Sequence, residues 1–287
     1  MKFRTEIQIN PSLLRITQHS PVMLLGSCFV ENIAEKMNQS GFEINVNPFG
    51  IVYNPESTAN CLYDLFQKRI YTETDLFEYQ DVFHSFAHHS RFSSKNKQEA
   101  LQKINDSIIS AADFLQKTEV LIVTFGTAMV YRLKSSGKIV SNCHKLPANQ
   151  FQEERLTISQ ITAQWNEIIS CLHRQNQKIQ VIFTVSPIRH WKDGSHSNQL
   201  NKAILLLAIN ELIQSHPQCH YFPSYEILLD DLRDYRFYAD DLIHPNSQAI
   251  AYIWEKLGDA YFDSAVKEQI AVYEREQKRL NHREIVQ

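Results

Sequence analysis

Two runs of this sequence are apolar at almost every position, residues 119–125 (EVLIVTF) and residues 179–185 (IQVIFTV). A strand with one face in water alternates apolar and polar residues, whereas a strand that is apolar throughout must be covered on both faces. Such strands are typical of a parallel sheet that lies between two layers of helices. These two runs therefore restrict the fold more than any other feature of the chain.

Helical stretches alternate with strand-like runs along the whole sequence. Further strands are expected at residues 21–25, 42–46 and 220–222. Helices are expected at residues 29–39, 55–68, 98–116, 159–174 and 198–214, and at 247–279 with a break near Asp263. This alternation predicts an α/β fold, a three-layer α/β/α sandwich around a doubly wound, mostly parallel sheet of five strands, as in flavodoxin-like proteins.

We expect residues 1–287 to form a single domain, because one apolar core is still practical at this length. Two segments depart from the alternation. Residues 131–140 resemble a small hairpin, and residues 70–95 form an aromatic-rich and histidine-rich excursion without a clear period. The helical stretch after residue 247 is expected to form a C-terminal tail.

Composition narrows the possible partners. The net charge of −3 gives no electrostatic reason to bind nucleic acid or an anionic membrane. The longest apolar runs fall far short of the roughly 20 residues that span a bilayer, and the N-terminus lacks the apolar region of a secretory signal. The five cysteines are widely spread without a CxxC pair, which favours a reducing, cytoplasmic location. The sequence does not predict the oligomeric state.

The first strand ends at Gly26-Ser27, directly before a helix. In open α/β sheets, ligands bind at the carboxyl ends of the strands. A serine at this point lies beside the positive end of the helix, where backbone N–H groups can stabilise an oxyanion. A serine that simply caps the helix is the alternative interpretation of this residue.

Asp241 and His244 form a DxxH pattern between the last strand and the last helix. Serine is a weak nucleophile that needs an adjacent base, and a histidine held by a carboxylate is the usual one. We therefore predict that Ser27, His244 and Asp241 form a catalytic triad. An incidental acid and histidine on a surface loop is the alternative.

Several segments, in this order, resemble the GSCFA family, which is grouped with the SGNH or GDSL-like hydrolases. They are LLGSCFVENIAEKM, NPFGIVYNP, FGTAMVYRL, NCHK, SPIRHWKDG and YRFYADDLIHPNSQA, which together extend from about residue 20 to 256. One departure is Val30, where the family name has alanine. The resemblance implies an SGNH-hydrolase domain in which Ser27 is the nucleophile, His244 the general base and Asp241 the residue that orients it.

The resemblance also implies an oxyanion hole. The backbone N–H of Ser27 and that of Gly50, in the NPFG segment, correspond to two of its donors. SGNH enzymes typically carry Gly-x-Asn in the third segment, where this chain has Gly126-Thr127-Ala128. Loss of one such donor lowers the rate by roughly 10²–10³-fold. Either Thr127 or Asn142 replaces the missing amide, or the site is a weaker one, or it is not an esterase site.

Four residues are candidates for substrate binding. Arg189 and His190 follow the fourth strand at the expected functional edge, and an arginine there can hold a carboxylate or phosphate. His144, in NCHK, and Asn198, one helical turn before Lys202, are the others. For each of these, a purely structural contact is the alternative.

Two other features suggest chemistry. Cys28 follows Ser27 and is a possible thiol nucleophile, although packing into the core is the simpler expectation for a free cysteine. His84, His88 and His89 resemble a metal motif, but no glutamate accompanies them and the helical signal is poor. A lid over a pocket or plain packing suits them better, and we predict no metal and no cofactor. The short Gly26-Ser27 loop also lacks the phosphate cradle that FMN requires.

These features predict a carboxylic-ester hydrolase that acts on a small-molecule or glycan ester, for which an O-acetyl group on a carbohydrate is one example. Two alternatives use the same fold. One is a non-hydrolytic protein that binds a carbohydrate or acyl group, which the missing third-segment asparagine would explain. The other is a sugar O-acetyltransferase, in which an alcohol intercepts the acyl-enzyme.

Overall fold

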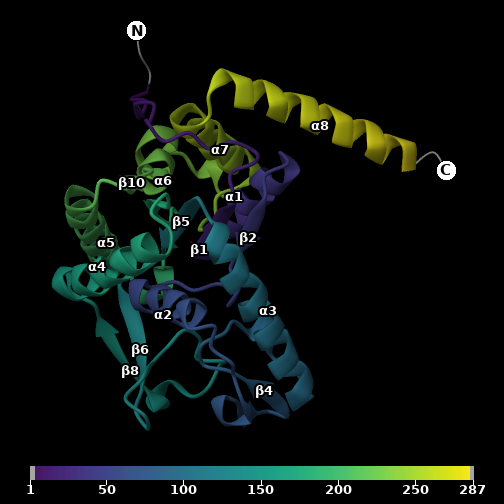
Figure 1. Ribbon diagram of the computed structural model, residues 1–287. Helices are drawn as coiled ribbons and strands as arrows, with labels where there is room; N and C mark the ends of the chain where they lie inside the picture. Colours follow the sequence, from purple (N-terminus) through teal and green to yellow (C-terminus); the bar gives the residue numbers. More distant parts are fainter. Residues whose placement is uncertain (1–3, 285–287) are drawn as a thin grey trace.

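The computed structural model describes residues 4–284 and is built on a parallel sheet of five strands (Figure 1). The strands lie in the order β10 (Cys219–Tyr221), β9 (Gln180–Val185), β5 (Val120–Phe125), β1 (Val22–Gly26) and β2 (Ile44–Val46). All neighbouring pairs in this sheet are parallel. The expected five-stranded α/β/α architecture is confirmed.

Strand β5 shows why the sheet must be covered on both faces. Leu121, Val123 and Phe125 contribute to one apolar core, and Val120 and Ile122 contribute to the other. Each core is closed by its own helices. Helices α1 (Cys28–Gln39) and α7 (Ser247–Tyr261) cover one face, and α2 (Pro55–Phe66), α3 (Lys97–Lys117), α4 (Ile158–Gln175) and α5 (Ser195–Ser215) cover the other.

Two small antiparallel sheets lie at the same end of the molecule (Figure 1). The 70–95 excursion forms the hairpin of β3 (Phe77–Tyr79) and β4 (Val82–His84). The hairpin expected near residues 131–140 is confirmed as β6 (Met129–Leu133) and β7 (Ile139–Val140), and β8 (Phe151–Arg155) adds a third strand that the sequence analysis missed.

Short turns complete the chain. They are η1 (Glu73–Asp75), η2 (Ser90–Phe92), η3 (Ala148–Gln150), η4 (Trp191–Asp193), η6 (Tyr235–Phe237) and α6 (Ser224–Glu226), which continues into the π-helix η5 (Ile227–Leu232).

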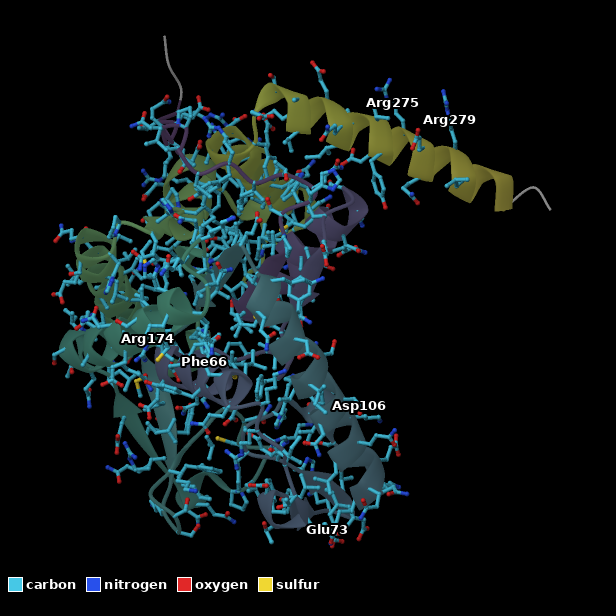
Figure 2. The ribbon with its side chains drawn as sticks, viewed as in Figure 1. Phe66, Glu73, Asp106, Arg174, Arg275 and Arg279 are labelled. Carbon is cyan, nitrogen blue, oxygen red and sulfur yellow. The ribbon has the colours of Figure 1, made fainter. Side chains whose placement is uncertain are left out.

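Helix α8 (Ser264–Glu284) follows α7 after a two-residue break at Phe262 and Asp263, and it extends away from the body of the protein (Figure 1). Figure 2 shows Arg275 and Arg279 on its outer side, pointing away from the sheet. Within residues 4–284, no helix has the length and apolar character required to cross a membrane.

Candidate active site

The turn between β1 and α1 is tightly constrained. Gly26 has a φ of 137°, and a Cβ at this position would lie 2.2 Å from the carbonyl oxygen of Thr124, so a side chain is excluded. Ser27 then occupies the N-cap of α1 with extended backbone angles, but its side chain makes no capping hydrogen bond. The Ser27 side chain is buried, and its Oγ has no hydrogen-bond partner among the described residues.

The loop before α7 holds the imidazole of His244 in one orientation. Asp241 Oδ1 accepts hydrogen bonds from the backbone N–H groups of Ile243 and His244, each at 2.9 Å. Its Oδ2 lies 2.5 Å from His244 Nδ1. The two backbone donors, followed by the imidazole, lower the pKa of the Asp241 carboxyl to about 2. A charged carboxylate that accepts from Nδ1–H leaves Nε2 free to act as a base.

The side chain next to this base is the thiol of Cys28. His244 Nε2 lies 3.8 Å from Cys28 Sγ, although the two residues are 216 positions apart in the chain. The order of groups is therefore carboxylate, imidazole, thiol. Ser27 lines the same pocket, but its hydroxyl forms no hydrogen bond with the imidazole.

These groups open into a pocket with a volume of about 440 Å³, which is within the usual range for small-molecule sites. It lies beyond the carboxyl ends of β1, β5 and β9, where ligands bind in open α/β sheets. The residues predicted from the sequence that line it are Ser27, Thr127, Asn142, Arg189, His190 and His244.

Besides Asp241, which contacts the pocket residue His244, three predicted residues lie outside the pocket lining. The N–H of Gly50 donates to the carbonyl of Asn47 at 2.7 Å, and Gly50 packs closely against His89. Asn198 is buried, and its Oδ1 accepts from the N–H of His190 at 3.0 Å. The structure thus places Asn198 behind a pocket residue.

The third, His144, is buried beneath the hairpin of the excursion. Its Nε2 lies 2.8 Å from the carbonyl oxygen of Ser85, and its ring packs edge-on against Phe77. Burial lowers the pKa of His144 to about 4. The imidazole is therefore neutral at physiological pH and makes structural contacts.

Arg189 and His190 form one wall of the pocket. The Arg189 guanidinium donates to the carbonyl of Leu242 at 2.9 Å and lies over the rings of Trp191 and Tyr238. Its buried Nε has no partner among residues 4–284. Burial, together with the charges of two nearby lysines, lowers the pKa of His190 to about 4, so a neutral imidazole faces the pocket.

The excursion histidines are used in packing. His88 is fully buried between Phe49 and Tyr71, and burial lowers its pKa to about 3. No group of His, Cys, Asp or Glu side chains in the described part of the chain is arranged to hold a metal ion.

The excursion also supports the pocket, because the carbonyl of Phe86 accepts from the N–H groups of Ser141 and Asn142.

Asn54 is a pocket residue that the sequence analysis missed. It is the N-cap of α2, where its Oδ1 accepts from the N–H of Ser57 at 2.8 Å. The preceding carbonyl, that of Tyr53, accepts from Gly126 and Thr127 at 2.7 and 3.1 Å. These two hydrogen bonds place Asn54 beside the Gly126-Thr127-Ala128 segment, where SGNH enzymes typically carry the asparagine that this chain lacks. Asn-Pro at a helix start was the available signal, but it indicated only a cap.

The spacing of Asn198 and Lys202 predicts that both face one cleft, with an exposed helix face as the alternative, and in the structure Lys202 is 1% exposed. Its Nζ donates to the carbonyls of Gly126 and Ser186, each at 2.7 Å, and to that of Ile188 at 3.0 Å. Burial lowers its pKa to about 7. Three acceptors favour the ammonium form, because a neutral amine has only two N–H bonds to donate. Lys202 thus ties together the loops that follow β5 and β9.

Comparison with known proteins places the chain in a family. The sequence profile of the GSCFA family matches residues 21–257, which include both the β1–α1 turn and the DxxH loop. The chain belongs to the GSCFA family. None of the curated proteins compared with this GSCFA protein matches it.

Solved structures similar to this GSCFA protein are distant. A Bacteroides fragilis protein, provisionally described as an acylhydrolase, is 8% identical with a TM-score of 0.42, over 90% of this chain and 91% of its own. A carbohydrate esterase of family 3 from Talaromyces cellulolyticus is 12% identical with a TM-score of 0.37, over 83% and 94%. An acetyl xylan esterase from Butyrivibrio proteoclasticus is 8% identical with a TM-score of 0.39, over 86% and 64%. Likenesses this distant do not decide an activity, so the functional argument rests on the site.

Proposed function

We propose that this protein hydrolyses a carboxylic ester through an acyl-enzyme, with His244 as the general base and Asp241 as the residue that orients it. The observation that carries the proposal is the line of groups at the pocket: Asp241 Oδ2 lies 2.5 Å from His244 Nδ1, and His244 Nε2 faces a potential nucleophile. Such an arrangement activates a weak nucleophile toward an acyl carbon.

The reaction follows from these positions. His244 Nε2 accepts the proton of the nucleophile, which attacks the ester carbonyl and forms an oxyanion. The imidazolium returns the proton to the leaving alcohol, and the acyl group stays on the protein. His244 then activates a water that releases the acid. The sequence assigns the nucleophile to Ser27, and the neighbouring Cys28 is the alternative in the same turn.

The oxyanion requires donors at the nucleophile, and the pocket offers three side chains. Thr127 has a hydroxyl proton to donate, since its Oγ accepts from the N–H of Met129 and no acceptor for that proton is present among the described residues. Asn142 and Asn54 each use Oδ1 as an acceptor in a local turn, which leaves the Nδ2 group of each without a protein acceptor in the described structure. We assign the role of main amide donor to the oxyanion to Asn54, because the hydrogen bonds from Gly126 and Thr127 to the Tyr53 carbonyl hold Asn54 beside Gly126.

The pocket suggests the kind of ester. A volume of about 440 Å³ accommodates a short acyl group and part of its alcohol. At the rim, the indole of Trp191 is 50% exposed, with the Arg189 guanidinium against it. An aromatic face beside polar donors suits a sugar ring, so an O-acylated carbohydrate is the substrate class that we propose.

The test is hydrolysis of a panel of p-nitrophenyl esters from acetyl to octanoyl, and of acetylated sugars, by wild type and by His244→Ala. We expect turnover of the short esters, and a loss in His244→Ala of at least about 10³-fold in kcat with the melting temperature unchanged. No turnover of any ester by wild type would refute the proposal.

The same samples separate the two alternatives. A transferase, given an acetyl donor and a sugar, would form acetyl-sugar faster than it releases acetate. A non-hydrolytic binding protein would bind acetylated sugars in calorimetry, and neither wild type nor His244→Ala would turn them over.

A further inference from the structure

We propose that Cys28, and not Ser27, is the side chain that takes the acyl group, so that the protein is a Cys–His–Asp hydrolase. This inference rests on the proposed function, because it names the nucleophile of that same site.

The first argument is geometric. Successive residues on a helix point about 100° apart, since a turn holds 3.6 residues. Ser27 is at the N-cap with extended backbone angles, outside that geometry, so only the observed contacts show which of the two side chains faces His244. In the structure Cys28 Sγ is the atom at 3.8 Å from Nε2. Ser27 Oγ is buried and has no hydrogen-bond partner in the described structure, so the imidazole does not contact it in this arrangement.

The second argument comes from the backbone. An oxyanion hole usually includes the N–H of the nucleophilic residue. The N–H of Ser27 is already used, because it donates to the carbonyl of Thr124 at 3.2 Å. The N–H of Cys28 is at the first position of α1, where a helix supplies no acceptor of its own. Of the two neighbouring residues Ser27 and Cys28, it is Cys28 that combines a side chain beside the base with a backbone donor available for the oxyanion.

The third argument explains why a base is needed. Burial raises the pKa of the Cys28 thiol, and the Glu31 carboxylate raises it further. The N–H groups of Cys28 and Phe29 and the charge of Lys202 act in the opposite direction without reversing the shift. The thiol therefore holds its proton at neutral pH, and His244 must remove that proton during attack.

Each step of the chemistry balances. The proton of Cys28 Sγ moves to His244 Nε2 as the S–C bond forms, and the C–O bond breaks as that proton passes to the alcohol. A thioester remains. Water then gives one proton to His244 and adds to the thioester carbon. The S–C bond breaks, and the proton returns to sulfur, so the net reaction is ester plus water to acid plus alcohol.

The experiment compares Cys28→Ala, Ser27→Ala and, as a matched control cysteine away from the pocket, Cys171→Ser. We expect Cys28→Ala to lose at least about 10³-fold in kcat/KM on p-nitrophenyl acetate, and Ser27→Ala to lose less than about tenfold. Acyl-enzyme trapped in acid should be released by neutral hydroxylamine, which cleaves a thioester and leaves an oxygen ester. Loss of activity in Ser27→Ala with retention in Cys28→Ala, or a hydroxylamine-resistant adduct, overturns the inference.

A second measurement keeps the assignment testable if no ester is hydrolysed. Alkylation of Cys28 by iodoacetamide at pH 7, followed by peptide mass mapping, reports the thiol directly, with Cys171 as the internal reference. We expect His244→Ala to slow alkylation of Cys28 by at least about tenfold while Cys171 is unaffected, because the base that assists the thiol is gone. Equal rates of Cys28 alkylation in wild type and His244→Ala would refute the pairing of the Cys28 thiol with the His244 imidazole, whatever the outcome of the ester assay.

Discussion

Replacing Lys202 with methionine removes the ammonium that joins the loops after β5 and β9. Methionine has a similar length but no donor, so the carbonyls of Gly126, Ser186 and Ile188 would lose their buried partner. Leaving a buried acceptor unsatisfied costs about 1–3 kcal/mol. The low end applies here, because the cost of burying the ammonium itself disappears at the same time. For three carbonyls we expect a loss of about 3 kcal/mol in the free energy of unfolding.

This loss is large enough to measure by thermal unfolding. An unfolding entropy of about 2.1 cal/mol/K per residue gives about 0.6 kcal/mol per kelvin for a chain of this length, so Tm should fall by about 5 °C. Circular dichroism at 222 nm follows the transition. The control is Glu211→Met on the same helix, an exposed position that should shift Tm by less than about 1 °C.

The prediction has a clear counter-result. If the Tm of Lys202→Met lies within about 1 °C of that of wild type, the three carbonyls find other partners, and the Lys202 ammonium does not hold the two loops together. Esterase activity measured on the same samples, well below Tm, should fall as well, because Gly126 and Ile188 adjoin the pocket.

Three further predictions concern the site and the excursion. Asp241→Asn should lower kcat for ester hydrolysis by about 10⁴-fold, because the imidazole loses the carboxylate that fixes its tautomer; a loss below tenfold in a p-nitrophenyl acetate assay contradicts this role. Asn54→Ser keeps a good helix cap but removes the amide, so kcat should fall by about 10²–10³-fold at unchanged Tm, and full activity would exclude Asn54 as the donor. His88 has a pKa of about 3 in the fold, below its value of about 6.5 in an unfolded chain, so the unfolded state binds more protons between these values. Stability should therefore decrease as pH falls from 6.5 toward 3, and His88→Leu should flatten this dependence in melts recorded at each pH.

The sequence by itself determined the architecture. A run such as VLIVTF is too apolar to leave either face in water, so a parallel sheet between helix layers followed from the pattern of residues along the chain. Chain order then placed Ser27 and Cys28 after the first strand, and it placed the DxxH loop before the last helix of the sandwich. Because all five strands are parallel, their carboxyl ends share one edge, and residues 216 positions apart could be expected to meet there.

Only the tertiary structure decided which side chains meet. Ser27, at the N-cap, has a buried hydroxyl without a hydrogen-bond partner in the described structure, whereas the Cys28 thiol, one residue later, lies 3.8 Å from the imidazole. Helical periodicity cannot distinguish adjacent residues at such a turn. The same holds for Asn54, which reaches the pocket because the carbonyl of Tyr53 accepts from the N–H of Gly126. It also holds for Lys202, whose burial depends on acceptors in the loops after two different strands. Contacts of this kind depend on how separate elements pack together, and no local sequence pattern encodes them.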